Sequence, residues 1–439
     1  MKLAMAVVLG LFFTFNLILL LNGVGLIITP LSNMDTFLDM VRPLYVLSSI
    51  FCIRKYSVRD GIVATISRKE MLITISANCI LVYLFSSTFR STELEEISLK
   101  LFYLVIYGQH VFSFVIISCH NMRLSKVFVE LIKILQEIYN FERSQLSSKA
   151  VKRKLMIACG ILIYLYIEVT IPKIVLDPYW NWYRCLFLGL SIIVDFEMVF
   201  IIFVIRFLAL KFKTWSKVMI KYSSDQKNYN CQTNFMNIDS PIQEIRNTSS
   251  RRKYETENLT ERRQDSAIEV YEEFDVDNRD EAKKLFEVYD QLVNSTNLMK
   301  SAFQFTVRDL LVTFSSVFVF PIILFPQLNT KTRSGVLISH SAGIVAWIAK
   351  ALFIQAFVGY EMECLYTGVR ASRTAACVLV GRRHDLATTR SAKNALRLSS
   401  SRPCRFKAVG ALPVDAALPL RLAALVGSYT VVLLQFALP

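Results

Sequence analysis

The sequence predicts an all-α membrane protein with seven transmembrane helices, and three observations lead to this fold class. The 439 residues are 54% hydrophobic and include 31 Phe, and the mean hydropathy of +0.42 is too high for a soluble protein of this length. Several apolar runs reach the roughly 20 residues that a helix needs to cross a hydrocarbon core of about 30 Å. Basic residues gather on one side of these runs, as expected for membrane proteins.

Seven runs combine this length with few internal charges. We predict spans at Met71–Ser87, Leu101–His120, Leu155–Val175, Cys185–Leu210, Phe303–Phe325, Val336–Tyr360 and Ala416–Leu438. An eighth apolar run lies within residues 1–38, and three interpretations stay open for it: a signal peptide, a further span or an error in the gene model.

The distribution of Lys and Arg predicts which helix ends face the cytoplasm. Most cations lie before the first span and in the connections that follow the second, fourth and sixth spans. The positive-inside rule therefore puts the amino end of the first span in the cytoplasm and the C-terminus outside. Cytoplasmic loops facing anionic lipid explain the formal net charge of +15. Nucleic-acid binding is not expected, because no folded basic domain is present.

No catalytic or metal-binding pattern stands out in the sequence. The nine Cys and four His are scattered without CxxC pairs or ligand spacing. We find no HExxH, GxSxG, Walker or dinucleotide-binding motif. We therefore expect no enzyme, no cofactor and no metal.

The chain divides by composition after residue 38. We assign a cytoplasmic amino segment with spans one to four (39–220), a polar insert (221–283), spans five and six (284–360), a basic cytoplasmic segment (361–415) and the last span (416–439). The insert contains "DQKNYNCQTNFMNIDS", which has too few apolar residues to fold alone. We expect it to be disordered and cytoplasmic.

The last span has an acid before its start and a polar face near its end. Asp415 can cap the helix, because a carboxylate suits a positive helix end. Ser428 and Gln435 lie seven residues apart and so almost on one face, and Tyr429 and Phe436 make a neighbouring pair. Two interpretations stay open. Gln435 lies among lipid headgroups while the aromatic residues pack on other helices, or the polar face borders the water of a pore.

The end of this span resembles the terminal signature of insect gustatory receptors. That signature reads Thr-Tyr, five apolar residues and Gln-Phe, and this chain has "SYTVVLLQF", in which Ser428 replaces the Thr. Three further stretches are similar to the family: "VRPLYVLSSIFCIRKYSV" at 41–58, "YEMECLYTGVRASRTAA" after the sixth span and "RPCRFKAVGALPVD" before the last. Leu412 stands where the family usually has an aromatic residue. The resemblance covers residues 39 to 436.

The resemblance implies a ligand-gated, non-selective cation channel that detects tastants. It would be a multi-pass protein of the plasma membrane that forms homo- or heterotetramers with other gustatory receptors, with the last helix lining a shared pore. By position, Gln435 and Phe436 are gate candidates, Ser428 and Val432 line the pore further along, and Tyr429 is a packing or gating contact. A ring of Phe closes a pore by excluding water, and Gln amides replace part of an ion's hydration without fixed charge.

Polar side chains within the other spans are the candidate contacts for a small-molecule tastant. Ionisable groups at membrane depth are costly and often functional, although for two of them, Glu168 and Asp195, we favour an ion pair or hydrogen bond within the bundle. Tyrosine is also ordinary packing material at a membrane interface. The candidates are Tyr107, Tyr164, Glu168, Asp195, His340 and Trp347.

Three other protein classes stay open. An insect odorant receptor of the same superfamily would keep the pore and change the ligands. A G-protein-coupled receptor would need the reverse orientation, in which the sequons at Asn247 and Asn258 would be glycosylated; the chain has neither an Asp-Arg-Tyr end to the third span nor an Asn-Pro-x-x-Tyr in the seventh. A secondary transporter would show repeated halves, and we find no internal repeat.

Overall fold

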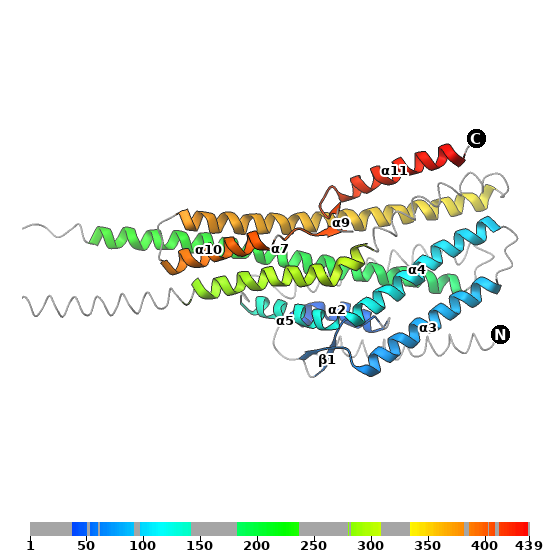
Figure 1. The fold of residues 1–439 in the computed structure, drawn as a ribbon, viewed down its shortest axis with the longest axis horizontal. Helices are drawn as coiled ribbons and strands as arrows, with labels where there is room; N and C mark the ends of the chain where they lie inside the picture. The colour runs from blue at the N-terminus through cyan, green and yellow to red at the C-terminus, as the bar shows by residue number, and fades with distance from the viewer. Residues whose placement is uncertain are drawn as a thin grey trace, which may run out of the picture. The chain divides into compact units, whose positions relative to one another are not determined.

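We describe the fold from a computed structural model. It describes residues 37–50, 53–59, 62–91, 97–141, 182–236, 280, 282–308, 334–381, 386–402, 404–408 and 412–437. These residues are mostly helical, as the sequence predicts, and their strands form short antiparallel hairpins (Figure 1). The chain divides into unit 1, with Met1–Phe207, Ser295–Cys364 and Arg405–Pro439, and unit 2, with Leu208–Asn294 and Leu365–Cys404.

The elements follow one another along the chain with two long helices in the middle. The first half contains α2 (Phe37–Ile50), β1 (Ser57–Arg59), β2 (Ile62–Ala64), α3 (Arg68–Ser91), α4 (Ile97–Arg123), α5 (Ser125–Phe141) and α7 (Trp182–Met236). Residues 282–308 form a further helix. Then come α9 (Ser334–Gly381), α10 (Leu386–Ser401), β3 (Lys407–Ala408), β4 (Leu412–Pro413) and α11 (Leu418–Ala437).

Helices α7 and α9 are much longer than a bilayer requires. They have 55 and 48 residues, which at 1.5 Å per residue gives lengths of roughly 80 and 70 Å, whereas a hydrocarbon core is about 30 Å thick. Each helix therefore contributes residues to both units.

Helix α3 begins with a capping box and packs on α4. The Ser67 Oγ accepts a hydrogen bond from the N–H of Glu70 at 3.3 Å, and the Ser67 N–H donates to Glu70 Oε2 at 2.8 Å. This reciprocal pair satisfies two N–H groups at the start of the helix. Apolar side chains then join α3 and α4 to α7 and to the loop before β1: Ile53, Leu81, Val111, Phe114, Ile117 and Leu190.

The outer surface of α3 is apolar, whereas its buried surface is partly polar. Leu72, Ile75 and Tyr83 are exposed, Tyr83 by 71%, while Thr74 and Asn78 are buried. A helix in water shows the opposite pattern. Among the described helices, Arg68–Ser87 in α3 has the length and composition to cross a membrane, with a mean hydropathy of 1.5, and Leu418–Tyr429 in α11 is a shorter apolar helix.

Unit 2 is organised around Tyr289. Its ring packs against that of Trp215 in a tilted arrangement, with ring centroids 4.6 Å apart, and its hydroxyl forms hydrogen bonds with Ser372 of α9 and Ser399 of α10. Burial is the largest effect on Tyr289 and raises the pKa of its phenol, against the lowering effect of these hydrogen bonds. Tyr289 therefore joins helix 282–308 to α9 and α10.

The start of α11 is fixed against α9 in unit 1. Asp415 caps α11 as predicted, because its Oδ1 accepts a hydrogen bond from the Ala417 N–H at 3.1 Å, and its Oδ2 pairs with Arg421 at 3.2 Å. A Cβ added at Gly359 of α9 would lie 2.5 Å from the carbonyl oxygen of Asp415. Glycine is therefore required where α9 meets the entry to α11.

Two predicted segments differ from the structure or lie outside it. The polar insert was predicted to begin at residue 221 as a disordered segment, whereas α7 continues as a helix to Met236. Extending an existing helix needs no new nucleation, so a polar sequence can prolong one that packing has already formed. The predicted third span, Leu155–Val175, and most of the fifth lie outside the described residues.

Replacing Gly359 by Ala should displace the start of α11. The added methyl meets backbone rather than a mobile side chain, so we expect a loss of about 1–3 kcal/mol in unfolding free energy, measured by thermal unfolding of the detergent-solubilised protein. Gly381→Ala is the matched control, because nothing lies within 4 Å of a Cβ at that position. Equal stability of the two variants would contradict the close contact.

Candidate functional site

A buried lysine forms an ion pair at the centre of unit 1. Lys55 is only 5% exposed, and its Nζ pairs with Glu197 Oε2 of α7. The same Nζ lies 4.1 Å from the ring centroid of Phe200 and 5.6 Å from those of Phe128 and Phe303. Lys55 thus contacts α5, α7 and helix 282–308 through one carboxylate and three aromatic faces, which attract a cation through their quadrupoles.

The residues around Lys55 hold it in place. Tyr45 of α2 stacks on Tyr56 with centroids 5.3 Å apart, and its Oη accepts a hydrogen bond from the Val58 N–H at 3.4 Å. Burial lowers the pKa of Lys55, against the raising effect of Glu197. Burial likewise raises the pKa of the Tyr56 hydroxyl. The short β1–β2 hairpin follows directly and keeps this turn of chain close to α2.

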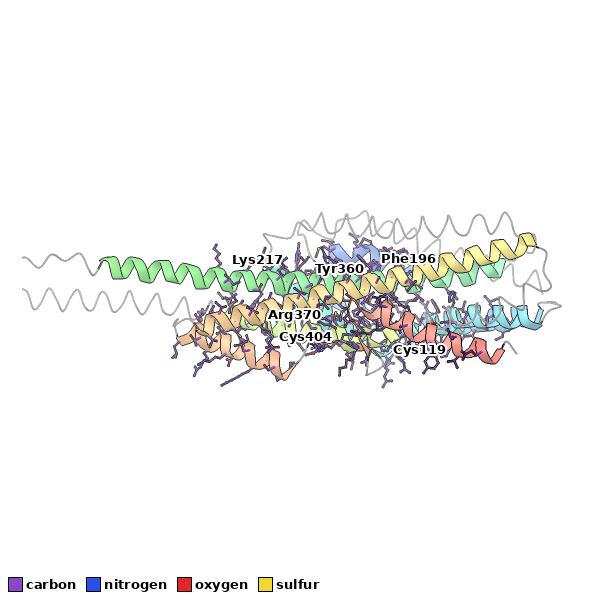
Figure 2. All side chains as sticks on the ribbon, turned by 90° about the horizontal axis from the view of Figure 1, so that it is seen from above. Cys119, Phe196, Lys217, Tyr360, Arg370 and Cys404 are labelled. Atoms are coloured by element: carbon purple, nitrogen blue, oxygen red, sulfur yellow. The ribbon has the colours of Figure 1, made fainter. Side chains whose placement is uncertain are left out.

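A small cavity lies beside the ion pair. Its volume is about 20 Å³, which is enough for one water molecule. Phe196, which Figure 2 labels, and Phe200 line one side of it, and Tyr45, Ser48 and Tyr56 line the other. Lys55 and Glu197 also line the cavity, so a water molecule there would solvate the buried charges.

Two further ion pairs join α7 to α9 in unit 1. Lys350 Nζ lies 2.8 Å from Asp195 Oδ2, and Arg206 Nη1 lies 2.9 Å from Glu361 Oε1. Each pair joins residues 155 positions apart, so the two helices run parallel in one register.

Polar contacts also join α4 to helix 282–308 and to α7. His120 Nε2 lies 3.1 Å from the carbonyl oxygen of Ala302, so this nitrogen must carry the proton, since a carbonyl can only accept. The neighbouring Asn121 donates from Nδ2 to Glu197 Oε1 at 3.5 Å. Charges and amides from four helices thus form polar contacts with one another within unit 1.

The ion pairs of unit 1 join helices to one another. Lys55, Lys350 and Arg206 each pair with a carboxylate. Within the described ranges, no group of three His, Cys, Asp or Glu side chains could hold a metal ion. The ion pairs therefore fix how the helices of unit 1 are arranged against one another.

The exposed face of α11 carries the predicted pore residues. Leu418, Leu422 and Val426 are buried and define the inner face of the helix. After Val426 every described side chain is exposed, on all sides of the helix, with Tyr429 exposed by 63%. The Ser428 hydroxyl donates to the Ala424 carbonyl at 2.9 Å. The exposed residues include Arg421, Ala424, Leu425, Ser428, Tyr429, Val431, Val432 and Gln435.

The remaining predicted site residues are placed only in part. Phe436 lies in α11, Tyr107 in α4, and His340 and Trp347 in α9, with side chains outside the described part of the chain. Tyr164 and Glu168 also fall outside it. Asp195 forms the ion pair with Lys350, which agrees with the internal pair that we favoured for it over a ligand contact.

Sequence reasoning missed the partners of the buried acids. Lys55 was counted only as a cytoplasmic charge, and Lys350 and Glu361 were not singled out. One signal was available: Asp195 and Arg206 are eleven residues apart, as are Lys350 and Glu361, which is three helical turns and puts each pair on one face. An acid followed by a base on α7 matches a base followed by an acid on α9 at the same spacing, and this complementarity indicates a shared register.

Comparison with protein-family models and with curated proteins finds no match to this chain. The likeness to gustatory receptors therefore rests on the residues quoted above.

Removing Lys55 alone should destabilise the protein more than removing both members of the pair. Lys55→Met leaves a buried carboxylate unpaired, so we expect a loss of about 3–5 kcal/mol, whereas Lys55→Met with Glu197→Met should recover most of it. Thermal or denaturant unfolding in detergent measures both. Lys126→Met is the control, because Lys126 is exposed on α5 and should change stability by less than about 0.5 kcal/mol. Additive effects of the two core changes would refute the pairing.

Proposed function

We propose that this protein is a ligand-gated cation channel of the gustatory receptor type, with α11 lining the pore. The observation that carries the proposal is the free outer face of α11, where Ser428, Val432 and Gln435 are exposed on the helix that ends in the receptor-like signature. A second copy of α11, or water between copies, can cover this face.

The surface of unit 1 supports membrane insertion. Along α3 the exposed residues are the cations Arg68 and Lys69, followed from Met71 by an uncharged and mostly apolar surface. Along α9 the exposed residues from Ala349 to Tyr360 are apolar or aromatic, and two of them, Phe353 and Phe357, stack with centroids 6.2 Å apart. Large exposed apolar patches are unusual on monomeric soluble proteins and indicate contact with lipid or a partner.

Charged exposed residues occur at alternating helix ends. They begin α3 and α11 and end α4, and on helix 282–308 the exposed side chains stay polar through Ser301, Gln304 and Arg308. This alternation is what a bundle shows when successive helices cross in opposite directions. We therefore place the inner end of the fifth span after Arg308 rather than at Phe303. In this arrangement the cations face the cytoplasm and anionic headgroups.

The exposed face of α11 fits a weakly selective pore. From Ala424 to Gln435 it holds no charged side chain, so a ring of such faces offers hydroxyl and amide groups to a hydrated cation without a fixed charge. The only charged residue on this face among those described is Arg421, and Asp415 pairs with it at 3.2 Å. The pair offsets a positive charge that would repel cations at the inner entrance.

The packing in unit 1 supports a route for gating. A tastant bound among the other spans would favour one arrangement of α7 and α9, which are joined by the pairs Asp195–Lys350 and Arg206–Glu361. A shift of α9 would pass to α11 through the contact between Gly359 and Asp415. The ligand can move this equilibrium only by its difference in affinity between closed and open states.

The same proposal covers assembly and location. Copies of the chain, alone or with related receptors, would meet as a tetramer in the plasma membrane, with lipid against the outer surface of α3 and small-molecule tastants among the spans. An insect odorant receptor of the same superfamily is the second candidate, since it would keep the pore and change the ligands. Panels of tastants and odorants applied in calcium imaging separate the two.

Single cysteines on α11 should report its contact with water. Ser428→Cys, Val432→Cys and Gln435→Cys, in a background without reactive native cysteines, should react with a membrane-impermeant thiol reagent when agonist opens the channel. Val426→Cys is the control and should stay unmodified, because Val426 is buried at 3% exposure. In whole-cell recordings Gln435→Ala should change permeation or gating. Lack of reaction at all three positions, in protein shown at the cell surface, would contradict the pore.

Glycan mapping should find Asn247, Asn258 and Asn294 unmodified in protein expressed in insect cells. In the proposed orientation all three face the cytosol, away from the glycosylation machinery. Asn294 has a further obstacle, since the next residues, Ser295 and Thr296, are fully buried in helix 282–308. An added sequon in the connection between the first and second spans is the positive control. Glycans on Asn247 or Asn258 would instead support the reversed topology of a G-protein-coupled receptor.

A further inference from the structure

Helix α10 presents a basic face to solvent. Arg390, Lys393 and Arg397 are exposed along one side of the helix, while Thr388, Ala392, Ala395 and Ser399 are buried on the other. No ion pair joins these three cations to any residue in the part of unit 2 that the structure describes. Leu386, at the start of the same face, is 81% exposed. The face is therefore positively charged with one apolar end.

The surrounding part of unit 2 supplies almost no negative charge. From Leu365 to Cys404 the sequence has eight Lys or Arg residues and one carboxylate, Asp385. Another exposed basic surface of unit 2, formed by Lys213 and Lys217 of α7 (Figure 2 labels Lys217), has carboxylates nearby. The Trp215 Nε1–H of α7 donates to the Leu285 carbonyl at 2.9 Å, and the helix that contains Leu285 carries exposed Glu287 and Asp290.

A strongly acidic stretch of the same chain precedes helix 282–308. "DSAIEVYEEFDVD", from Asp265 to Asp277, has six carboxylates and no Lys or Arg. It also contains Ile268, Tyr271 and Phe274, which can cover an apolar residue. The stretch lies outside the described residues, and its charge is opposite to that of α10.

The acidic stretch is attached to the chain within reach of α10. Tyr289 forms a hydrogen bond with Ser399 of α10, and helix 282–308 and α10 both begin at the end of unit 2 where α9 finishes (Figure 1). Ala282 lies about 10 Å before Tyr289 along its helix, and Lys393 lies about 9 Å before Ser399 along α10. Since Tyr289 and Ser399 are in contact, Ala282 and Lys393 lie at a similar level. The five residues from Asp277 to Ala282 can span up to about 17 Å.

We propose that the acidic segment Asp265–Asp277 binds along the basic face of α10 formed by Arg390, Lys393 and Arg397. Carboxylates of the segment pair with the three cations, and its apolar side chains cover Leu386. Because such surface pairs are individually weak and are screened by salt, the contact is reversible and depends on ionic strength. The polar insert thereby acquires a defined position on unit 2.

Zero-length cross-linking of the purified full-length protein tests this contact. A carbodiimide joins a lysine amine to a carboxylate only when the two touch, so mass spectrometry should find Lys393 linked to Glu269, Glu272 or Glu273. Arg390→Glu with Arg397→Glu keeps the reactive amine and should lower the yield about fivefold, as expected from the loss of two surface ion pairs. Both residues are exposed, so the core of unit 2 stays intact.

Two comparisons make the result specific. Lys213→Glu with Lys217→Glu is the matched control on α7 and should leave the Lys393 yield unchanged. Adding Glu272→Arg and Glu273→Arg to the α10 variant should restore links from Lys393 to the remaining carboxylates. A mixture of isotopically labelled and unlabelled chains distinguishes links within one chain from links between copies.

Three outcomes would overturn the proposal: no link from Lys393, links only between copies, or links from the acidic segment to Lys217 in place of Lys393. The measurement detects a contact and not a current. Its result therefore stands apart from the question of whether α11 lines a pore.

Discussion

The arrangement of unit 1 depends on finding a partner for every charge that α7 carries into the bundle. A charge without a partner in an apolar interior costs several kcal/mol. Helix α7 carries the acids Asp195 and Glu197 into the bundle, and its half-exposed Arg206 reaches a buried acid of α9. Asp195 pairs with Lys350 of α9, and Arg206 pairs with Glu361 of the same helix. Glu197 pairs with Lys55. Sliding α7 by one turn would break all three pairs together, so the pairs set the register of the bundle.

The same register positions the last helix. Because α7 and α9 are held parallel and in step, the level of Gly359 on α9 is fixed, and the backbone of Asp415 packs directly against it. Asp415 then caps α11 and pairs with Arg421. The charges of α7 and the start of the proposed pore helix are therefore linked through one continuous set of contacts within unit 1. A channel that opens by shifting α9 would use this set.

Sequence reasoning was most successful where the signal is local. The cap at Asp415 follows from an acid just before an apolar helix. It failed where a polar segment prolongs a helix that begins earlier in the chain. The polar residues from 221 to 236 were assigned to a disordered insert, although α7 runs through them. The pairing of Asp195 was favoured correctly, but its partner, Lys350, lies 155 positions away.

The sequence by itself determined that the chain is mostly helical and that its C-terminal helix has one polar and one aromatic stripe, because helical periodicity and capping act over a few residues. Only the tertiary structure decided which charges pair, that Lys55 is buried among Phe128, Phe200 and Phe303, and that the described side chains of α11 after Val426 are exposed. These features depend on contacts between residues far apart in the chain, whose energies are set by burial and distance in the folded protein.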